Sequence, residues 1–259
     1  MWWIAALAIM VILVAAMGTL IGPFLTLKRL PERAEINGAV LVKDGFVSAA
    51  LAPISEHEVA LVDAGDDIQA KALLAELARR GLGSDDVKVI LLTHGHRDHI
   101  GGIAKFPKAQ VMALAEEGDV VEGRSTGGAP IMRFRSPKPT GIRLSRTLHD
   151  GDVVQLGSFQ VRVFAAPGHT PGSAAYAIGT NLFLGDSANQ DKHGRLKAAP
   201  WMFSASAAQN RKSLLELARR LASDSSIKTL VFSHSAPLER GTAPLLEFAA
   251  AKSTTPNPS

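Results

Sequence analysis

The feature that most constrains how this chain folds is a histidine-rich stretch placed directly after an apolar run. Residues 87–92 (VKVILL) are almost wholly aliphatic, which is typical of a strand buried on both faces. The next ten residues, 93–102 (THGHRDHIGG), crowd three histidines and one aspartate into one loop. Burying so many polar groups together is costly unless something binds them. The pattern predicts a metal site, and because the chain has no cysteine, histidine and carboxylate side chains must hold any metal.

The spacing of these side chains indicates how they are shared. Residues two apart in an extended loop face the same way, so His94 and His96 are expected to converge on one ion. Asp98 and His99 begin the next turn and are expected to point toward a second ion. The neighbouring glycines allow the tight backbone that such crowding needs.

Three further candidates stand at the ends of predicted strands. His169 lies in the turn PGHTPGS (167–173), Asp186 follows the run LFLG, and His234 follows VFS. Each is a weak signal alone, because a polar residue at a strand end is usually a turn former. Their order along the chain, together with the histidine-rich loop, makes the whole set specific.

Composition narrows the class of protein. The 259 residues allow one large domain or two small ones, and 46% hydrophobic with 20% charged residues is ordinary for a globular protein. A net charge of +4 and 5% aromatic residues do not favour a nucleic-acid binder. Without cysteine there is no disulfide, thiolate nucleophile or thiolate-held iron–sulfur cluster. The expected partner is a small-molecule substrate rather than nucleic acid.

The N-terminal segment, residues 1–27, carries no charged side chain. About 20 apolar residues span the hydrocarbon core of a bilayer. Trp2 and Trp3 stand where an interfacial anchor would lie, and Lys28 and Arg29 supply a basic flank. A cleaved signal peptide is the alternative, but nothing basic except the α-amino group precedes the apolar run. The sequence therefore predicts a single transmembrane anchor.

The basic flank also predicts an orientation and a division of the chain. By the positive-inside rule the region after the helix faces the cytoplasm; it would be periplasmic or extracellular if the segment acts as a signal anchor. A basic linker (28–35), a catalytic domain (36–251) and a disordered tail (252–259) are expected to follow the anchor. Nothing in the sequence indicates an oligomeric state.

Short apolar runs alternating with helical periodicity predict a layered α/β or α+β domain rather than a helix bundle. Strands are expected at 39–42, 59–62, 87–92, 110–113, 159–164, 174–178, 182–184 and 229–232. Helices are expected from the acidic pair 66–67 to about residue 80, and over about 206–221. Both patterns fail between 118 and 144, where we expect a long loop or insertion.

Taken together, the polar residues resemble the signature of the metallo-β-lactamase superfamily, a His-x-His-x-Asp-His loop followed by a His, a bridging Asp and a final His. The matching residues are His94, His96, Asp98, His99, His169, Asp186 and His234. The resemblance covers residues 36–250 and includes Asp63 at the end of an early strand. It implies a four-layer αββα sandwich, here preceded by the N-terminal helix, with the site at one edge of the two sheets.

The resemblance further implies two divalent metal ions, with zinc preferred over manganese or iron(II). The two implied ligand sets are His94, His96 and His169 for one ion, and Asp98, His99 and His234 for the other, with Asp186 bridging them. A bridging hydroxide would then attack a carbonyl or phosphoryl centre, and Asp98 would be the catalytic residue that steers its proton. Asp63 would orient the loop from behind the ligands; an ordinary turn residue is the alternative.

Membership of a fold family leaves the substrate open, but departures from subgroup patterns narrow it. The absence of cysteine excludes the β-lactamase group with a cysteine ligand. Acyl-homoserine lactonases carry a tyrosine three residues after the bridging Asp, where this chain has Asn189, whose amide could partly replace a phenol as oxyanion donor. Glyoxalase II relatives carry a helical C-terminal extension, whereas only residues 235–259 follow the last histidine. The leading interpretation is a generic or glyoxalase II-like hydrolase of an ester, thioester, lactone or related bond.

Two groups of residues are candidates for contacts with that substrate. Trp201, Met202 and Phe203 follow the bridging Asp and would form an apolar wall for an acyl or aryl group, unless they are core or lid residues. The basic residues of the long loop could attract an anionic substrate or lipid headgroups, although a solvated loop is the simpler interpretation. They are Arg133, Arg135, Lys138 and Arg143.

Two other functions stay open. A mononuclear iron oxygenase of the persulfide dioxygenase kind would need only two histidines and one aspartate as ligands. A non-catalytic, membrane-tethered binding module would keep the fold without turnover, but so many polar groups in one place are hard to explain without metal. Metal identity and stoichiometry separate these interpretations.

Overall fold

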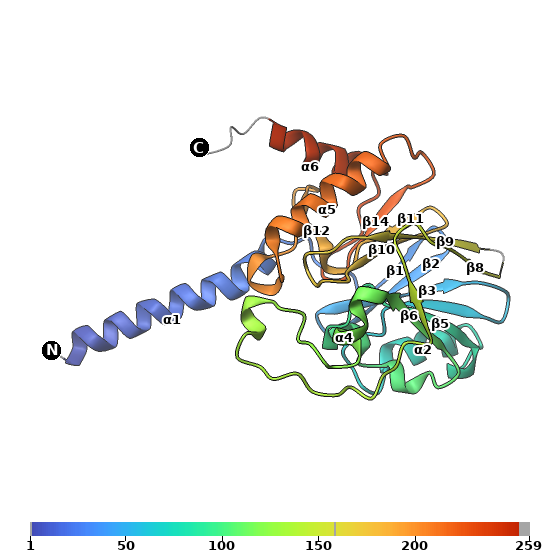
Figure 1. Ribbon diagram of the computed structural model, residues 1–259, viewed down its shortest axis with the longest axis horizontal. Helices are drawn as coiled ribbons and strands as arrows, with labels where there is room; N and C mark the ends of the chain where they lie inside the picture. Colours follow the sequence, from blue (N-terminus) through green and yellow to red (C-terminus); the bar gives the residue numbers. More distant parts are fainter. Residues whose placement is uncertain (1, 158, 254–259) are drawn as a thin grey trace.

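The computed structural model describes residues 2–157 and 159–253. Two β-sheets form the centre of the molecule, helices lie outside them, and one long helix, α1, projects away from this body (Figure 1). The strand order is β1-β2-β3-β4-β5-β6-β7 in the first sheet and β14-β11-β10-β9-β8 in the second. Strands β12 and β13 form a separate two-stranded sheet.

The bounds of these elements are as follows. The first sheet contains β1 (Arg33–Ile36), β2 (Ala39–Asp44), β3 (Val47–Pro53), β4 (Val59–Val62), β5 (Val87–Leu91), β6 (Gln110–Leu114) and β7 (Arg146–Leu148). The other strands are β8 (Val153–Leu156), β9 (Phe159–Ala165), β10 (Ala174–Ile178), β11 (Asn181–Phe183), β12 (Ala188–Gln190), β13 (Leu196–Ala198) and β14 (Thr229–Val231). The α-helices are α1 (Trp2–Leu25), α2 (Lys71–Arg79), α3 (Arg97–Ile100), α4 (Gly118–Val121), α5 (Ala207–Arg220) and α6 (Ala243–Ser253). The short 3-10 helices are η1 (Ser84–Asp86), η2 (Ile103–Lys105), η3 (Ala115–Glu117), η4 (Pro130–Met132), η5 (Gly185–Ser187) and η6 (Trp201–Phe203).

The pairing of the strands decides where the loops gather. From β1 to β4 the neighbours are antiparallel, and from β4 to β7 they are parallel. The second sheet is antiparallel except for the parallel pair β11 and β14. The carboxyl ends of parallel strands meet at one edge of a sheet, which is where open α/β sheets bind ligands. The loops after β5, β11 and β14 are therefore expected at common edges.

Strand β5 shows how the layers are built. Leu91 belongs to the apolar cluster between the two sheets, and Ile90 belongs to the cluster beneath α2, because successive side chains of a strand point to opposite faces. Leu77 of α2 closes the outer face of the first sheet, and Leu217 of α5 packs with Leu230 on the outer face of the second. Three apolar clusters thus separate four layers, and the mixed α/β sandwich that the sequence predicts is confirmed.

Most predicted strands are present with bounds within one or two residues, but the first predicted helix begins later than expected. Asp66 and Asp67 lie in a loop before α2 rather than in its first turn. Their backbone N–H groups both donate to the Asp44 carboxylate at 2.7 Å, and Ala70 at the helix boundary has a left-handed backbone (φ 49). The acidic pair is held by a turn, because Asp side chains favour turns over helix interiors.

The two ends of the domain also differ from expectation. The predicted linker (28–35) is partly structured, because β1 starts at Arg33 and the Lys28 N–H donates to the Gln190 carbonyl at 3.0 Å. At the other end α6 reaches Ser253, so the first two residues of the predicted tail are helical; 254–259 lie outside the described residues. Backbone hydrogen bonds to neighbouring segments, which local sequence does not reveal, account for the linker.

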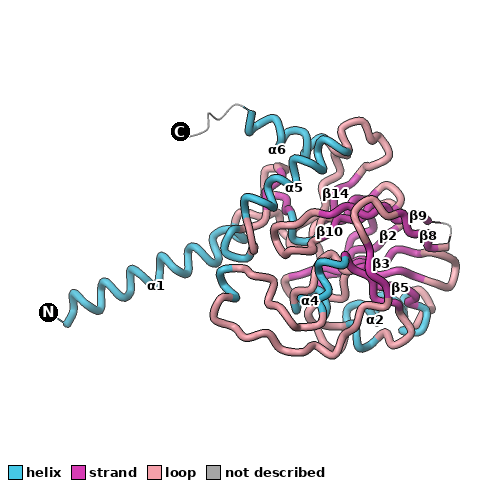
Figure 2. Tube along the Cα trace, viewed as in Figure 1, coloured by secondary structure: helices cyan, strands magenta, loops and turns pink. Residues whose placement is uncertain are grey.

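The stretch between α4 and β7 is almost entirely loop, as the failed periodicity predicts (Figure 2). It contains only η4 as a helical turn, and it runs along the same side of the molecule as the base of α1 (Figure 1). The turn η4 contacts η6, which brings this loop to the segment that follows Asp186. The loop therefore forms one wall of the region in which the site residues lie.

Helix α1 covers Trp2–Leu25 and contains Pro23 in its last turn. Judged on the residues that the structure describes, no helix has both the length and the apolar character needed to cross a membrane. The predicted transmembrane span therefore stays a prediction.

A buried ion cluster fastens the first strand to the first sheet's helix layer. Glu76 of α2 is only 3% exposed and accepts hydrogen bonds from Arg33 Nε at 2.9 Å and from Arg80 Nε at 3.1 Å. These hydrogen bonds, that of Arg33 first, lower the pKa of the Glu76 carboxyl despite its burial. A charged partner that is buried and hydrogen-bonded is expensive to lose.

We expect Glu76→Gln to lower the free energy of unfolding of the metal-free protein by about 1–3 kcal/mol at pH 7. A carboxyl with a lowered pKa stabilises the fold above its ordinary pKa of 4.5 and loses that effect as pH falls through the lowered value. The gap between wild type and variant should therefore shrink below about pH 4. Urea unfolding at pH 7 and at about pH 3 checks this. Glu216→Gln, which removes an exposed pair with Arg219, is the control; an equal loss there would contradict the role of burial.

Candidate metal centre

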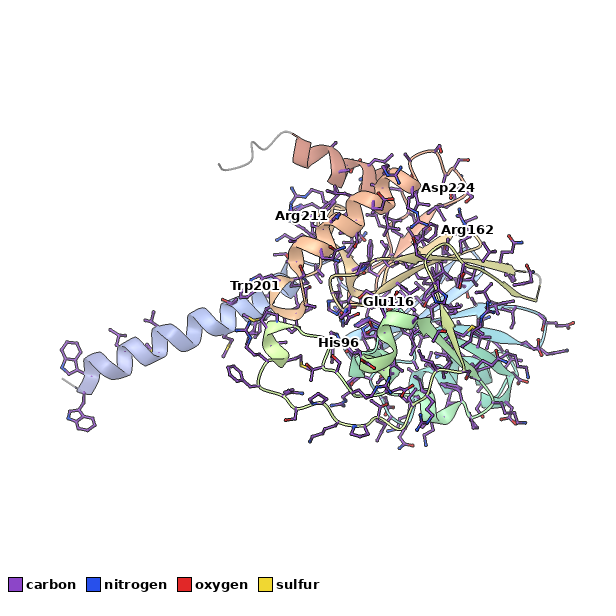
Figure 3. The ribbon with its side chains drawn as sticks, in the orientation of Figure 1. His96, Glu116, Arg162, Trp201, Arg211 and Asp224 are labelled. Carbon is purple, nitrogen blue, oxygen red and sulfur yellow. The ribbon has the colours of Figure 1, made fainter. Side chains whose placement is uncertain are left out.

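The candidate ligands come from four strand ends of the two sheets. His94 and His96 follow β5, and Asp98 and His99 lie in the short helix α3 that comes next. His169 lies in the turn between β9 and β10. Asp186 lies in η5 after β11, and His234 follows β14. His96 lies in the middle of the molecule where the two halves meet (Figure 3). The sandwich thus brings together side chains that are up to 140 positions apart (234 − 94).

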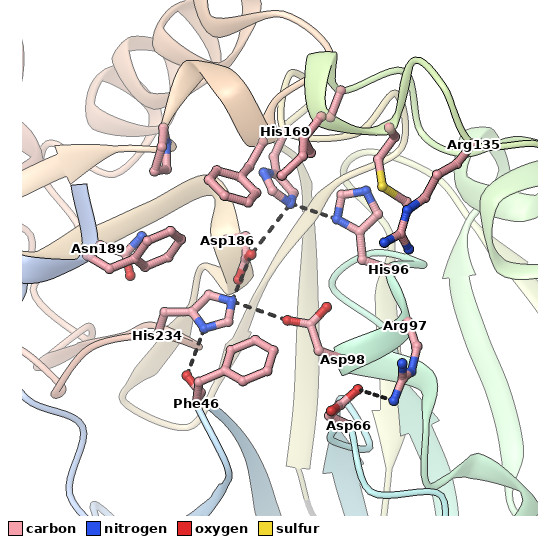
Figure 4. Close-up of a pocket in the computed structure, with 16 residues that line it drawn as sticks. Phe46, Asp66, His96, Arg97, Asp98, Arg135, His169, Asp186, Asn189 and His234 are labelled. Carbon is pink, nitrogen blue, oxygen red and sulfur yellow. Dashed lines mark hydrogen bonds and ion pairs between the residues drawn. The ribbon is translucent and has the colours of Figure 1, made fainter. Parts of the chain in front are cut away.

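The structure brings all seven predicted ligands into one cluster. Among the described residues, three groups have donor atoms that lie within 4.8 Å of one another inside each group: His94, His96 and His169; His94, His99 and Asp186; and Asp98, His99 and His234. The first and third groups are the two sets that the resemblance implies. Asp186 reaches toward both, since its Oδ2 lies 3.5 Å from His169 Nε2 and 3.0 Å from His234 Nε2 (Figure 4).

Several buried atoms of this cluster make no hydrogen bond within the described part of the chain. Among the described residues, no hydrogen-bond partner exists for Nε2 of His94, His96 and His99, for Nδ1 of His169 or for Oδ1 of Asp186. More than 90% of buried polar groups are normally paired, so five such atoms in one place need an explanation. Imidazole nitrogen and carboxylate oxygen are the ligands that zinc and similar ions prefer. The donor set therefore fits a pair of divalent ions.

The pKa shifts of the three histidines in the first group also favour metal binding. Burial lowers the pKa of His94 well below 6.5 and also lowers that of His96. Burial likewise lowers the pKa of His169 to about 3. These three imidazoles are therefore neutral at physiological pH, which is the form that binds metal.

The second group carries charge without metal. Burial acts to lower the pKa of His99, but the facing carboxylates of Asp63 and Asp186 outweigh it and raise this pKa well above 6.5. Burial likewise acts to lower the pKa of His234, but the carboxylates of Asp186 and Asp98 outweigh it and raise this pKa to about 10. Burial acts to raise the pKa of Asp98, and His99 with His234 outweigh it and lower the value to about 2. A cation entering here has to displace the imidazolium protons, so metal uptake should release protons.

Asp63 stands behind the cluster, where the sequence predicts an orienting residue. It is 2% exposed and has a left-handed backbone (φ 60) at the end of β4. Its Oδ2 lies 2.8 Å from His99 Nδ1, and its Oδ1 accepts the Thr93 N–H at 2.8 Å. Because Nδ1 of His99 is held by this carboxylate, Nε2 is the atom turned toward the cluster. Carboxylate–histidine contacts of this kind fix the tautomer and orientation of a metal-binding ring.

Sequence reasoning missed Glu117, a fully buried carboxyl at the end of η3. Its Oε1 accepts the Gly95 N–H at 2.7 Å, and its Oε2 accepts the Gly172 N–H and the Thr170 hydroxyl, both at 2.8 Å. It therefore ties the loop of His94 and His96 to the turn of His169. Burial raises its pKa to about 7 against these hydrogen bonds. Nothing in the run Ala-Glu-Glu-Gly distinguishes this residue, since its partners are groups distant in sequence.

A second contact that sequence could not show holds His234. Its Nδ1 lies 2.9 Å from the carbonyl oxygen of Phe46, and the Phe46 ring stacks on the imidazole at 5.6 Å between centroids. A carbonyl can only accept a hydrogen bond, so Nδ1 carries the proton and Nε2 faces the carboxylates. Phe46 belongs to the turn between β2 and β3, which a strand pattern does not connect to the site.

A pocket of about 350 Å³ opens over the cluster. Its walls include the predicted Asn189 and Phe203, whereas Trp201 and Met202 are not among the lining residues, and Trp201 is 56% exposed near the base of α1 (Figures 3 and 4). Of the four basic loop residues, Arg135 lines this pocket and Lys138 lines a neighbouring one. The predicted apolar wall is therefore carried by Phe203 alone among the three residues named for it.

Asn189 of β12 is buried and has an unsatisfied hydrogen-bond acceptor. It is 2% exposed, and its Oδ1 has no hydrogen-bond partner among the described residues. Buried polar atoms without partners are rare, and this one lies in the wall of the pocket. Its amide oxygen is therefore a hydrogen-bond acceptor that no described residue satisfies.

Comparison with known proteins gives the same picture. The family model described as metallo-beta-lactamase superfamily matches residues 43–234, which confirms the resemblance seen in the sequence. The hydroxyacylglutathione hydrolase of Photobacterium profundum is 34% identical over 168 residues, covering 63% of this chain and 53% of that protein. Human metallo-beta-lactamase domain-containing protein 1 is 31% identical over 153 residues, covering 57% of this chain and 50% of that protein. The chain spans about half the length of the curated relatives it matches.

Solved structures agree on the fold. A subclass B3 metallo-beta-lactamase of Bradyrhizobium japonicum superposes with a TM-score of 0.64 at 21% identity, covering 88% of this chain and 93% of that one. A metallo-beta-lactamase family protein of Thermus thermophilus has a TM-score of 0.61 at 25% identity, covering 85% and 81% respectively.

We expect Asp63→Asn to weaken divalent metal binding by about 10–100-fold, because the amide cannot hold both Thr93 and the His99 ring as the carboxylate does. Competition with a chromogenic chelator measures the affinity, and circular dichroism reports whether the fold is kept. Asp85→Asn changes an exposed carboxylate paired with Lys108 and should leave the affinity unchanged. Wild-type affinity in Asp63→Asn would show that Asp63 is only a turn residue.

Proposed function

Because this chain belongs to the metallo-β-lactamase superfamily, we propose that it is a metal-dependent hydrolase of an ester, thioester or related acyl bond. The observation that carries the proposal is the convergence of partnerless buried imidazole nitrogens on two ionised carboxylates at the floor of a pocket. The relatives named hydroxyacylglutathione hydrolase support hydrolysis of an acyl thioester.

The ligand roles follow the geometry of the cluster. One ion would be held by the three neutral histidines and the other by Asp98 with His99 and His234, and Asp186 would lie between them; the neutral set is His94, His96 and His169. When bound, two divalent ions supply Lewis acidity and a water that ionises near neutral pH. No protein nucleophile is then required, which fits a chain without cysteine.

The chain's own residues would orient the substrate and handle the proton. Asp98 is ionised, lines the pocket and is 20% exposed, so its carboxylate can accept a hydrogen bond from the attacking water and steer that water's proton. We infer that the side-chain N–H of Asn189, which lines the same pocket, donates toward an oxygen that gains negative charge. A donor placed in this way typically contributes about 10²–10³-fold to a hydrolytic rate.

We expect the purified full chain to retain about two equivalents of zinc or manganese, as a paired site requires. His94→Ala and Asp186→Ala should each lower hydrolysis of short acyl thioesters by more than ~100-fold, since changes behind a ligand alone cost ~10–100-fold. His149→Ala removes an exposed histidine outside the cluster and is the control. Mass spectrometry for metal content and thiol-release kinetics are the measurements.

Other results would point to other functions. One equivalent of iron with oxygen uptake would favour the mononuclear oxygenase. Full activity in either ligand variant would exclude the proposed centre. Tight binding of metal with no turnover of esters, thioesters, lactones or phosphodiesters would favour a binding module.

We also propose that residues 1–27 anchor this hydrolase in a membrane. The support is the absence of charged side chains in the segment, its helical backbone over Trp2–Leu25 and the basic pair Lys28-Arg29 that follows. The same basic flank favours a cytoplasmic position for the folded domain.

Leu7 and Val11 are exposed on α1, at 51% and 58%. Arginine at the centre of a spanning helix costs about 2.5–3.5 kcal/mol, so Leu7→Arg with Val11→Arg should shift the protein from the membrane fraction to the soluble one. Ile68→Arg with Val153→Arg, at similarly exposed sites of the domain, is the matched control. Carbonate extraction followed by immunoblotting measures the shift; an unchanged membrane fraction would contradict the anchor.

A further inference from the structure

The outer wall of the pocket is apolar and comes from segments far apart in the chain. Phe46 lies in the turn after β2, Ile131 and Met132 lie in η4, and Phe203 lies in η6; all four line the pocket. The metal-binding side chains form the floor, so a molecule in the pocket has polar groups at one end and hydrocarbon along one side (Figure 4). Apolar lining with a few convergent polar groups is the usual character of a small-molecule site.

The last turn of α1 belongs to this wall. Phe24 lines the pocket, and its ring meets Phe203 edge-on at 5.3 Å and His234 edge-on at 6.1 Å between centroids. The residues that follow are fixed to the β12–β13 hairpin, because the Lys192 N–H donates to the Thr26 carbonyl at 3.0 Å. Helix α1 therefore meets the domain at the mouth of the pocket and not at a distant face.

Cationic side chains stand at the same mouth. Arg135 lines the pocket, and no salt bridge of this side chain occurs within the described part of the chain. Arg97 lines it too, with 80% of its side chain exposed and Asp66 at 3.3 Å. The pocket thus offers one unpaired positive charge beside its apolar wall, which would attract an anionic group.

We propose that the substrate is an acyl ester or thioester whose acyl part is an unbranched apolar chain of medium length, with an anionic group elsewhere in the molecule. This inference rests on the proposed hydrolase function. The acyl chain lies along Phe24, Phe46 and Phe203, and the anionic group lies at Arg135. A volume of about 350 Å³ is at the small end of ligand pockets, so about four to eight carbons are enclosed and a longer acyl chain extends toward α1.

The apolar wall makes a quantitative expectation for the metal-loaded full chain. Each fully buried methylene favours binding by about 4-fold. From acetyl to octanoyl thioesters of 3-mercaptopropionate, kcat/KM should therefore rise by at least ~10-fold. Phe24→Ala and Phe203→Ala should each reduce this octanoyl-to-acetyl ratio by at least ~5-fold. Phe159→Ala, an exposed phenylalanine of β9 outside the pocket, should keep the wild-type ratio.

A second series tests the charged end. Octanoyl thioesters of 3-mercaptopropionate and of the uncharged N-acetylcysteamine are compared at low ionic strength. Arg135→Gln should lower the preference for the carboxylated thiol by at least ~3-fold, a typical size for one exposed charge contact. Arg143→Gln, 87% exposed in the same loop and not lining the pocket, should not change it. An unchanged preference in Arg135→Gln would overturn the anionic part of the proposal.

The outcomes separate this inference from the function on which it rests. Equal kcat/KM for acetyl and octanoyl thioesters would overturn the acyl-chain proposal and leave the hydrolase in place. No hydrolysis of either by protein with two bound metal equivalents would overturn the hydrolase itself. A wild-type chain-length ratio in both Phe24→Ala and Phe203→Ala would move the acyl chain away from this wall and also overturn the proposal.

The substrate could reach the pocket from the aqueous phase or from a bilayer. The same acyl thioesters distinguish these two sources. The full-length protein is placed in phosphatidylcholine vesicles with octanoyl and dodecanoyl thioesters, and lipid is added at constant bulk substrate. A rate that follows the mole fraction in the bilayer identifies the membrane as the source. A rate that follows the aqueous concentration identifies solution as the source, and either dependence supports a substrate with an apolar chain.

Discussion

The structure depends on a group of polar atoms that are buried together and that make no hydrogen bond within the described part of the chain. Nitrogens of His94, His96, His99 and His169 and an oxygen of Asp186 face one another at the junction of the two sheets. Desolvated polar groups of this kind destabilise a fold unless a ligand satisfies them. The chain keeps three of the rings neutral by burial and two others cationic by facing them with carboxylates. The cluster is thus prepared for metal at a cost in stability that the surrounding sandwich must offset.

The sandwich offsets that cost and also sets the geometry of the site. The first sheet contributes the loop after β5, and the second contributes the ends of β9, β11 and β14. The apolar cluster between the sheets, including Leu91 and Val231 directly before these loops, holds the two halves at a constant separation. Glu117 adds a direct connection, because its two oxygens bind backbone groups of the loops that carry His96 and His169. The packing of the two sheets therefore also fixes the relative positions of the candidate ligands.

Helix α1 gives the pocket its remaining wall. Its base is held by backbone hydrogen bonds to the hairpin that carries Asn189, and Phe24 contacts both Phe203 and His234. The apolar N-terminal segment thereby reaches the cluster of candidate ligands, which is the most polar region that the sequence predicts. The proposed acyl substrate would bridge these two environments, with its reacting carbon at the ions and its chain along the aromatic rings. An anchor in this position would orient the pocket with respect to the bilayer as well as tether it.

How much of the fold and of the candidate site the sequence could predict depends on how far apart in the chain the interacting residues are. Hydrophobic periodicity and the His-x-His-x-Asp-His spacing are local, so the main strands, the layered α/β class and all seven candidate ligands were accessible from sequence alone. Strands such as β3, with its small residues, and β12 and β13 in a short hairpin have weak local patterns and were missed. Other features depend on partners from 22 to 210 positions away in the chain (117 − 95 and 234 − 24). These features are the helix start at Lys71, the roles of Glu117 and the Phe46 carbonyl, and the place of Phe24 in the pocket.

The sequence by itself thus determined which chemistry this protein can carry, because ligand identity and spacing are properties of the chain. Only the tertiary structure decided which backbone groups hold those candidate ligands and which side chains line the pocket, because those contacts form between segments that share no local pattern.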